Sequence, residues 1–401
     1  MSILANPTIL IFVRYYLPGF KSGGPVRSVS NMVSELSEEF TFRIITTDRD
    51  YLSDEPYSDS QTGRQSDGEV KWYRVGAADV LYLPPADQNW RNITRLVREI
   101  HADVIYLNSL FDPQFSLPVL WEKWRKGPDM PPLICAPRGE TSPGALAFKP
   151  LKKSVFLCLL RLSRLPMQIV FHATAEPERI EIQTSLGHAV DVHVAGNLTT
   201  KHLPSPRPKN WAEEAANGPL KIAFLSRIHP KKNLDYLLAC LYQLQHPAEL
   251  AIYGPIDDQG YWEDCQRYIA KMPDHISTSY NGAIEHDEVI SELSVHHLFF
   301  FPTKGENFGH VIHEAVQAGC VLLISDKTPW QDLSEYRIGW SLPLLGKQAF
   351  IDVLEELAGW QSYQWEAHEL AVRSYADRIN ITSHDKKNHL VMLQKVAENG
   401  S

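Results

Sequence analysis

The chain has 401 residues, which is too long for one ordinary hydrophobic core and favours about two domains. Its 39 lysine and arginine residues and 48 aspartate and glutamate residues give a net charge of −9, which argues against a protein whose main partner is nucleic acid. The five cysteines are widely spaced and form no C-x-x-C pair, so neither a disulfide framework nor a zinc site is indicated, and a reducing cytoplasm fits best.

The N-terminal apolar run, TILIFV (8–13), is interpreted as a first strand. It is short and is preceded by no basic segment or small-residue cleavage pattern, so it does not resemble a signal peptide. No apolar run approaches the roughly 18 residues of a membrane-spanning helix. We therefore expect a soluble or peripheral protein.

Short, continuously apolar segments recur along the chain and predict buried strands of parallel sheets covered on both faces. They are TILIFV (8–13), FRIITT (42–47), DVIYLN (103–108), PPLICAP (131–137), QIVFHAT (168–174), VDVHVAG (190–196), KIAFLS (221–226), ELAIYG (249–254), HHLFFFP (296–302) and CVLLIS (320–325). Between many of them lie stretches of helical period, at 25–40, 233–245, 287–294 and 309–319. Such alternation predicts a doubly wound α/β fold.

A segment rich in proline and polar residues, 199–220, interrupts the alternation and is interpreted as an inter-domain linker. We accordingly expect an N-terminal Rossmann-like domain at 1–203, a C-terminal one at 204–383, and a closing helix at 384–401. The polar stretch 53–68 is expected to form a loop.

The segment KGENFGHVIHEAVQAG (304–319) joins an expected strand to an expected helix and carries two glutamates, Glu306 and Glu314, on either side of Gly309. Backbone N–H groups at such a helix start favour an anionic ligand, most simply a phosphate. Carboxylates cannot bind phosphate, but they accept hydrogen bonds from hydroxyl groups. A nucleotide-sugar has hydroxyls on both sides of its pyrophosphate, so the pattern indicates a nucleotide-sugar site.

Two further segments fit this ligand. In FLSRIHPKKN (224–233), Arg227 ends a strand and Lys232 lies at a helix start, where fixed cations would stabilise the charge that develops on a leaving pyrophosphate. Gly23 and Gly24 lie between the first strand and the first helix and either allow close approach of a ligand or simply form a turn. Because the full G-x-G-x-x-G spacing is absent, dinucleotide binding is disfavoured.

Together, the E-x7-E pattern, SRIHPKKN, the glycine pair and ISDKTPWQDL (324–333) resemble the family-4 retaining glycosyltransferases, whose GT-B fold consists of two doubly wound Rossmann-like domains facing a central cleft. The resemblance implies that Glu306 contacts the donor sugar, Glu314 the ribose, and Arg227 and Lys232 the diphosphate. It also implies donor contacts from further residues, many of them through the backbone. These are Gly23, Gly24, Asn307, Phe308, Gly309, His310, Val311, and the region of Gly282 and Ile284 near the base.

The chain departs from the family pattern at Arg138. Many members have a histidine after the strand that corresponds to PPLICAP, but this chain reads APRGE. A permanently charged guanidinium cannot act as a base. Arg138 is therefore a candidate either for orienting the donor or an anionic acceptor, or for a structural ion pair.

The expected reaction moves a sugar from a UDP- or GDP-linked donor to a hydroxyl of a glycan or lipid-linked oligosaccharide, with retention of configuration, in bacterial surface polysaccharide or lipopolysaccharide synthesis. This hexosyltransferase type of chemistry, as the resemblance implies it, requires neither a metal nor another cofactor. His310 and His313 beside Glu314 lack the full zincin pattern. A nucleotide-sugar 2-epimerase of the same fold and a non-catalytic nucleotide-sugar-binding protein are the alternatives.

The stretch 148–167 mixes five lysines and arginines with leucines and phenylalanines. The favoured interpretation is a helix that packs its apolar side on the first domain. The alternative is a helix that lies on an anionic membrane surface, where a lipid-linked acceptor would be found. The expected location is the cytoplasm, with peripheral contact at the inner face of the cell membrane under this alternative.

Overall fold

The structure, a computed structural model, describes residues 6–58, 72–147, 149–199, 207, 210–380 and 384–398. The chain divides into two compact units, Met1–Thr200 with Ser383–Ser401 and Lys201–Thr382. Some positions named in the sequence analysis lie outside the described residues. They are the expected domain boundaries 203, 204 and 383, most of the linker between 200 and 209, residues 59–68 of the polar loop, Phe148, and residues 399–401.

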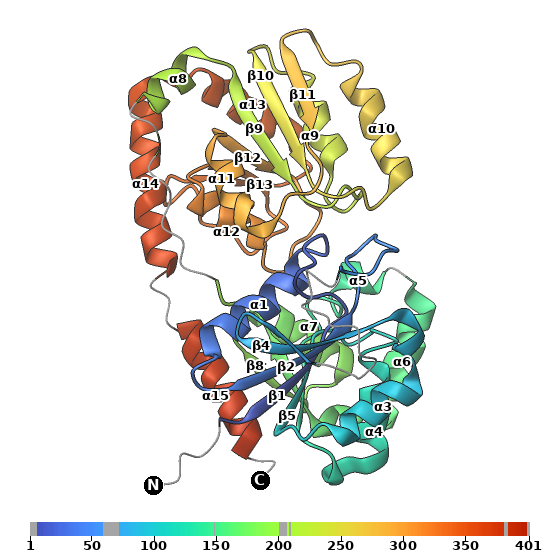
Figure 1. The fold of residues 1–401 in the computed structure, drawn as a ribbon. Coiled ribbons are helices and arrows are strands. Elements are labelled where there is room, and N and C mark those ends of the chain that lie inside the picture. The colour runs from blue at the N-terminus through green and yellow to red at the C-terminus, as the bar shows by residue number, and fades with distance from the viewer. Residues whose placement is uncertain are drawn as a thin grey trace. The chain divides into compact units, whose positions relative to one another are not determined.

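The first unit contains an eight-stranded sheet in the order β3-β4-β2-β1-β5-β6-β7-β8 (Figure 1). The edge strand β3 is antiparallel to β4, and all other pairs are parallel. The strands are β1 (Thr8–Phe12), β2 (Thr41–Thr47), β3 (Tyr73–Val75), β4 (Ala78–Leu83), β5 (Val104–Leu107), β6 (Leu133–Cys135), β7 (Ile169–Ala173) and β8 (Asp191–Val194).

Helices cover both faces of this sheet. Leu10 and Phe12 of β1 belong to one hydrophobic cluster and Ile9 and Ile11 to another, so successive side chains enter different layers of core. This explains why the strand is apolar throughout. The helices are α1 (Gly24–Leu36), η1 (Pro85–Asp87), α3 (Trp90–Glu99), α4 (Leu117–Lys126), η2 (Gly127–Asp129), α5 (Pro143–Leu146), α6 (Pro150–Leu162), η3 (Leu165–Gln168), α7 (Glu176–Leu186) and α15 (His384–Glu398).

The last helix, α15, returns to the first unit and contacts α1 and β5. Met392, Leu393 and Val396 are buried in the same cluster as Ile9 and Ile11. Figure 1 shows α1 and α15 on one side of the sheet and α3, α4 and α6 on the other. The amide N–H of Gly196 donates to Asp385 at 2.8 Å, which fixes the start of α15.

The second unit contains a parallel six-stranded sheet in the order β11-β10-β9-β12-β13-β14. This is the strand order of the Rossmann fold. The strands are β9 (Leu220–Leu225), β10 (Ala248–Tyr253), β11 (Ile276–Tyr280), β12 (Leu298–Phe301), β13 (Val321–Ser325) and β14 (Gly339–Leu342). The helices are α8 (Trp211–Asn217), α9 (Leu234–Leu241), α10 (Gln259–Ile269), η4 (His286–Glu288), α11 (Val289–Ser294), α12 (His310–Gln317), α13 (Lys347–Ala358) and α14 (Ser362–Asn380).

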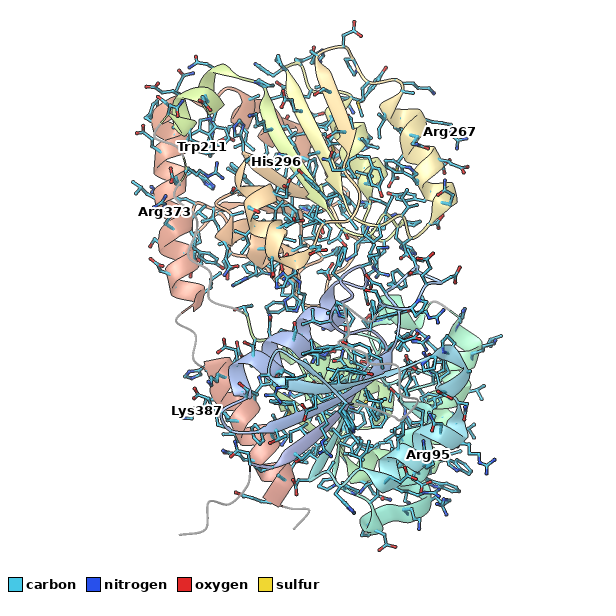
Figure 2. All side chains as sticks on the ribbon, viewed as in Figure 1. Arg95, Trp211, Arg267, His296, Arg373 and Lys387 are labelled. Carbon is cyan, nitrogen blue, oxygen red and sulfur yellow. The ribbon has the colours of Figure 1, made fainter. Side chains whose placement is uncertain are left out.

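Arg207 anchors the start of the second unit. Its guanidinium donates to the carbonyl of Gly319 at 2.7 Å and to that of His296 at 3.2 Å, and it lies 3.7 Å above the ring of Trp211. Figure 2 shows Trp211 on α8 and His296 before β12, whereas Arg267 and Arg373 lie on the outer helices α10 and α14. A half-buried cation held by carbonyls and an aromatic face fixes the chain at this entry point.

A buried histidine predicts that stability depends on pH. Burial lowers the pKa of His389 to about 4 from an ordinary 6.5, and its Nδ1 lies 2.9 Å from the carbonyl of Asp385. Between pH 6.5 and pH 4 the unfolded chain therefore binds a proton that the folded chain does not, and stability falls as the pH falls.

We expect His389→Asn, whose amide can keep the bond to Asp385, to reduce the loss of unfolding free energy between pH 7 and pH 5 by up to about 2 kcal/mol. Urea denaturation of both proteins at both pH values measures this difference. An equal loss in the two proteins would contradict the assignment.

Candidate functional site

The carboxyl edge of the second sheet, beyond β9 and β12, holds most of the predicted site residues. β10 lies on one side of β9 and β12 on the other, so the order of the strands reverses between β9 and β12. Open α/β sheets bind ligands at such a switch point, outside the carboxyl ends of the strands. Arg227 and Lys232 follow β9, and Glu306 and Gly309 follow β12.

Lys232 and Glu306 form an ion pair across this switch point. The Lys232 Nζ lies 2.5 Å from a carboxylate oxygen of Glu306, and the two side chains are only 13% and 20% exposed. The ammonium also lies 5.3 Å from the ring centroid of Phe301. The pair therefore joins the loops that follow β9 and β12, with both charges largely withdrawn from water.

The neighbouring cations are held at different depths. Arg227 Nη1 lies 2.9 Å from Asp257, but its side chain is 40% exposed. Burial lowers the pKa of Lys231, and the adjacent charge of Lys232 lowers it further. The edge thus presents three basic side chains near Glu306, of which Lys231 is exposed, Arg227 is half-buried and Lys232 is the most withdrawn from water.

The loop that follows β12 approaches helix α12 through a glycine. Gly309 has φ = 79°, and a Cβ there would lie 2.8 Å from Ile312 Cδ1, so both conformation and space favour glycine. As the N-cap residue it supplies no side-chain acceptor to the first turn. The indole of Trp330 donates to the carbonyl of Phe308 at 2.8 Å, and Glu306 N–H donates to the carbonyl of Lys327 at 2.9 Å. These bonds fix the loop.

The other predicted residues of this unit lie on the same helix or at the same edge. Glu314 belongs to α12 and is 7% exposed. Asn307, His310 and Val311 lie at the start of this helix or just before it, and the rings of Phe308 and His310 are 4.7 Å apart. After β11, the Gly282 carbonyl accepts a bond of 2.7 Å from Gly254 N–H, and Ile284 packs against the core.

Asn233 holds the loops of the candidate site together, although the sequence motifs did not identify it. It has a left-handed φ of 65° and is 4% exposed. Its side-chain amide donates to the carbonyl of Pro302 at 2.9 Å, which ties the start of α9 to the end of β12. Gly254 is a second such residue, because a Cβ there would lie 1.9 Å from the carbonyl oxygen of Ser226.

We expect Asn233→Ala to lower the free energy of unfolding by about 3 kcal/mol, because it loses a buried hydrogen bond and places alanine in a left-handed conformation. Asn233→Gly loses the bond without the strain, so we expect a loss about 1 kcal/mol smaller. Urea denaturation of the three proteins measures both changes. Equal losses in the two variants would show that strain contributes nothing.

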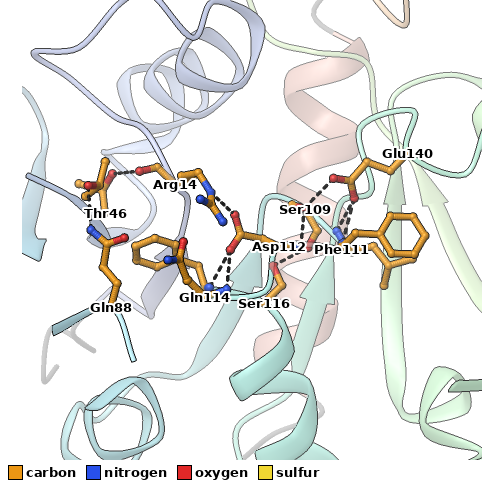
Figure 3. A network of polar contacts seen from close by, with 12 residues as sticks. Arg14, Thr46, Gln88, Ser109, Phe111, Asp112, Gln114, Ser116 and Glu140 are labelled. Carbon is orange, nitrogen blue, oxygen red and sulfur yellow. Dashed lines mark hydrogen bonds and ion pairs between the residues drawn. The ribbon is translucent and has the colours of Figure 1, made fainter. Parts of the chain in front are cut away.

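In the first unit, the loops after β1, β5 and β6 form a polar network at the carboxyl edge of the sheet (Figure 3). Arg14 Nε lies 2.6 Å from Asp112, whose N–H donates to Ser109 Oγ. The Ser109 hydroxyl in turn donates to Glu140 at 2.7 Å. Burial raises the pKa of Glu140. The network holds in place the loop that carries Arg138.

Arg138 donates to three neutral partners: Asn108 at 2.8 Å, Asn197 at 2.6 Å and the hydroxyl of Tyr106 at 2.8 Å. His172 Nδ1 lies 2.7 Å from that hydroxyl, and its Nε2 lies 2.8 Å from the carbonyl of Ala195. A carbonyl can only accept, so Nε2 carries the proton and Nδ1 accepts from Tyr106. Burial and the charge of Arg138 keep the pKa of His172 well below its ordinary value.

Arg138 thus lies among neutral polar groups of the first unit. Among the described residues no carboxylate forms an ion pair with it, so the structural ion pair is not found there. Neutral groups hold the guanidinium of Arg138 in place and do not compensate its positive charge.

The predicted glycine pair lies at the start of α1. Gly23 (φ = 71°) precedes Gly24, the first residue of that helix, and a Cβ at either position would meet open space.

Two surface pockets lie away from these loops. One, of about 300 Å³, is lined by residues at the amino ends of β9 and β10, and the other, of about 600 Å³, by residues at the amino ends of β5 and β6.

Within the described ranges, no three His, Cys, Asp or Glu side chains are grouped so that they could hold a metal ion. No helix in the described parts of the chain is both long and apolar enough to cross a bilayer.

Residues 207–334 match the family model described as glycosyl transferases group 1. This match and the fold support a glycosyltransferase. Arg227, Lys232, Glu306 and Glu314 lie inside the region that matches the glycosyltransferase model, whereas Arg138 lies outside it. No curated protein sequence gives a significant match to the chain.

Solved structures of glycosyltransferases and related enzymes have the same GT-B type of fold. HepE of Anabaena, in complex with UDP and glucose, is 14% identical, with 97% of this chain and 100% of that chain covered and a TM-score of 0.71. WaaG, a glycosyltransferase involved in lipopolysaccharide biosynthesis, is 13% identical, with coverage of 96% and 99% and a TM-score of 0.66. Sucrose-phosphate synthase of Thermosynechococcus elongatus is 12% identical, with coverage of 98% and 99% and a TM-score of 0.70. The predicted GT-B fold is therefore confirmed.

Proposed function

We propose that the protein is a retaining glycosyltransferase of the family-4 type that moves a hexose from a nucleotide-sugar to a hydroxyl of a glycan or lipid-linked oligosaccharide. The observation that carries this proposal is the Lys232–Glu306 pair at the β9–β12 switch point, with Arg227 beside it. Cations next to a carboxylate match a diphosphate that is joined to a polyhydroxyl ring.

Each site residue has a proposed role. Arg227 and Lys232 bind the diphosphate, helped by backbone N–H groups of residues 307–311 at the start of α12. Glu306 accepts hydrogen bonds from hydroxyls of the donor sugar. Glu314 accepts them from the ribose, and the region of Gly282 and Ile284 borders the base.

In the proposed reaction the acceptor hydroxyl attacks on the face from which the nucleoside diphosphate leaves. The glycosidic bond to the phosphate breaks, the new bond forms, and the departing phosphate takes the acceptor proton. Catalysis then consists mainly of positioning and of electrostatic stabilisation of the leaving group by Arg227 and Lys232. The side chains assigned here supply these functions without a metal or another cofactor.

For the donor we propose a UDP-linked hexose, with GDP-linked sugars as the second class to test. The support is that the HepE structures, which have this fold, are described as complexes with UDP and with UDP-glucose. The proposed setting is bacterial surface polysaccharide or lipopolysaccharide synthesis on the cytoplasmic side. Gly23, Gly24 and Arg138 would meet the donor phosphates or an anionic group of the acceptor.

The experiment incubates purified protein with UDP- and GDP-hexoses, with and without candidate lipid-linked acceptors, and follows the products by mass spectrometry and anomeric NMR. We expect release of nucleoside diphosphate, slow without acceptor and faster with it, and a product that keeps the donor's configuration. Conversion of the donor to its 2-epimer without acceptor would replace this proposal with the epimerase. Donor binding with neither transfer nor hydrolysis would replace it with a binding protein.

A further inference from the structure

Helix α6 has two apolar faces, and among the described residues only one of these faces packs on the rest of the protein. Leu157 and Leu160 are buried in the core of the first unit, and Phe156 packs against it. The opposite face carries Leu151 and Leu162, which are 82% and 74% exposed, together with Val155 and Leu159, which are 60% and 61% exposed. Their spacing of three or four residues forms one continuous stripe along the helix. We call these four residues the α6 stripe.

The sequence segment that contains the α6 stripe has basic side chains but no acidic ones. Residues 141–175 contain no aspartate or glutamate, in a chain whose net charge is −9. Arg161 donates hydrogen bonds to the carbonyl oxygens of Thr184 and Ser185, and Lys153 donates one to the carbonyl oxygen of Ala145. Because a carbonyl carries no net charge, these bonds leave the positive charges of Arg161 and Lys153 in place. The basic residues of this stretch are Lys149, Lys152, Lys153, Arg161 and Arg164.

Exposed tryptophans extend the apolar surface beyond α6. The segment η3, which follows α6, contacts both α6 and α4, and its Met167 is 58% exposed. Trp121 and Trp124 on α4 and Trp90 on α3 are 45% to 48% exposed, with ring centroids 5.0 and 6.2 Å apart. Tryptophan is the side chain that favours the boundary between water and lipid headgroups.

We infer that the α6 stripe and its flanking cations dock the first unit on an anionic lipid surface. The leucines and the valine would enter the headgroup and acyl boundary, while the lysines and arginines extend to lipid phosphates. Charge complementarity selects this occupant over a second copy of the chain, because two copies would bring these same cations together around the stripe. Helix α6 packs its inner face on the first unit, as the sequence favours, and also keeps an exposed apolar face.

The first test measures cosedimentation with vesicles of neutral phosphatidylcholine and with vesicles that contain 30% phosphatidylglycerol. We expect binding to the anionic vesicles that falls at least tenfold without the anionic lipid and weakens as salt is raised. Absence of binding, or equal binding to both compositions, would overturn the inference.

Variants assign the surface. Leu151→Asp with Leu159→Asp, and separately Lys152→Glu with Arg164→Glu, are each expected to lower vesicle binding at least tenfold. The matched control is Leu345→Asp, which changes a fully exposed leucine of the second unit and should leave binding unchanged. Thermal unfolding checks that each variant is folded. If wild-type protein dimerises in light scattering and the stripe variants do not, a second copy covers the stripe and the inference is wrong.

Cys158 provides a local probe, because it is exposed on α6 while the other four cysteines are buried. A polarity-sensitive thiol dye at this position is expected to shift its emission to shorter wavelength on anionic vesicles only. An unchanged spectrum on vesicles that bind the protein would show that another surface makes the contact. These measurements use no donor, so their failure leaves the proposed transfer reaction untouched, and failure of transfer leaves the docking surface untouched.

Discussion

Replacing Lys232 with alanine is expected to lower the rate of sugar transfer by about 10²–10³-fold at saturating donor, because the leaving diphosphate loses a fixed positive charge in a site shielded from water. The side chain is only 13% exposed and is already oriented by Glu306. Release of nucleoside diphosphate under single-turnover conditions measures the effect.

The control for this experiment is Lys271→Ala, which removes an exposed lysine after α10 and should change the rate less than twofold. Because Lys232→Ala leaves Glu306 without its partner, the unfolding temperature of the variant must be compared with that of the wild type. A folded Lys232→Ala protein that keeps more than a third of the rate would remove Lys232 from the catalytic machinery.

Glu306→Gln is expected to separate sugar recognition from nucleotide binding. Hydrogen bonds to a charged group contribute about 1.5–3 kcal/mol each and those to a neutral amide about half as much, so weaker bonds from the sugar hydroxyls should lower transfer about 10–100-fold. The same change leaves Lys232 without its anionic partner, and the ammonium is then freer to bind phosphate. Binding of the nucleoside diphosphate without sugar should therefore be unchanged or tighter.

Calorimetry with the nucleoside diphosphate and with the nucleotide-sugar measures the two affinities of Glu306→Gln. Glu249→Gln, at an exposed position of β10, is the matched control. Loss of affinity for the nucleoside diphosphate itself would contradict the assignment of Glu306 to the sugar.

The sequence predicted the sheets well where strands are buried on both faces. β1 and β12 are apolar throughout because successive residues face different layers of core. β3 and β14 were not predicted, since the first has three residues at an antiparallel edge and the second has mostly half-buried residues. β4 was missed although ADVLYL has the same apolar character.

At the candidate site, local motifs selected the proposed residues, but the contact partners of these residues are distant in the sequence. Glu306 is 74 residues from Lys232, and Asp257 is 30 residues from Arg227. No spacing rule connects such pairs before the strand order is known. Arg138 is the clearest case, because its partners Asn108 and Asn197 come from different loops and its role could not be read from its own segment.

The most direct test of the central claim is a thermal-shift titration of wild-type protein and Glu314→Ala with UDP, GDP, ADP, CMP and their common sugars, with and without EDTA. We predict that one nucleotide class raises the unfolding temperature of the wild type, that the rise persists in EDTA, and that it disappears in Glu314→Ala. If no nucleotide stabilises the wild type, or if the rise requires a divalent metal and persists in Glu314→Ala, the nucleotide-sugar site proposed at the β9–β12 edge is wrong.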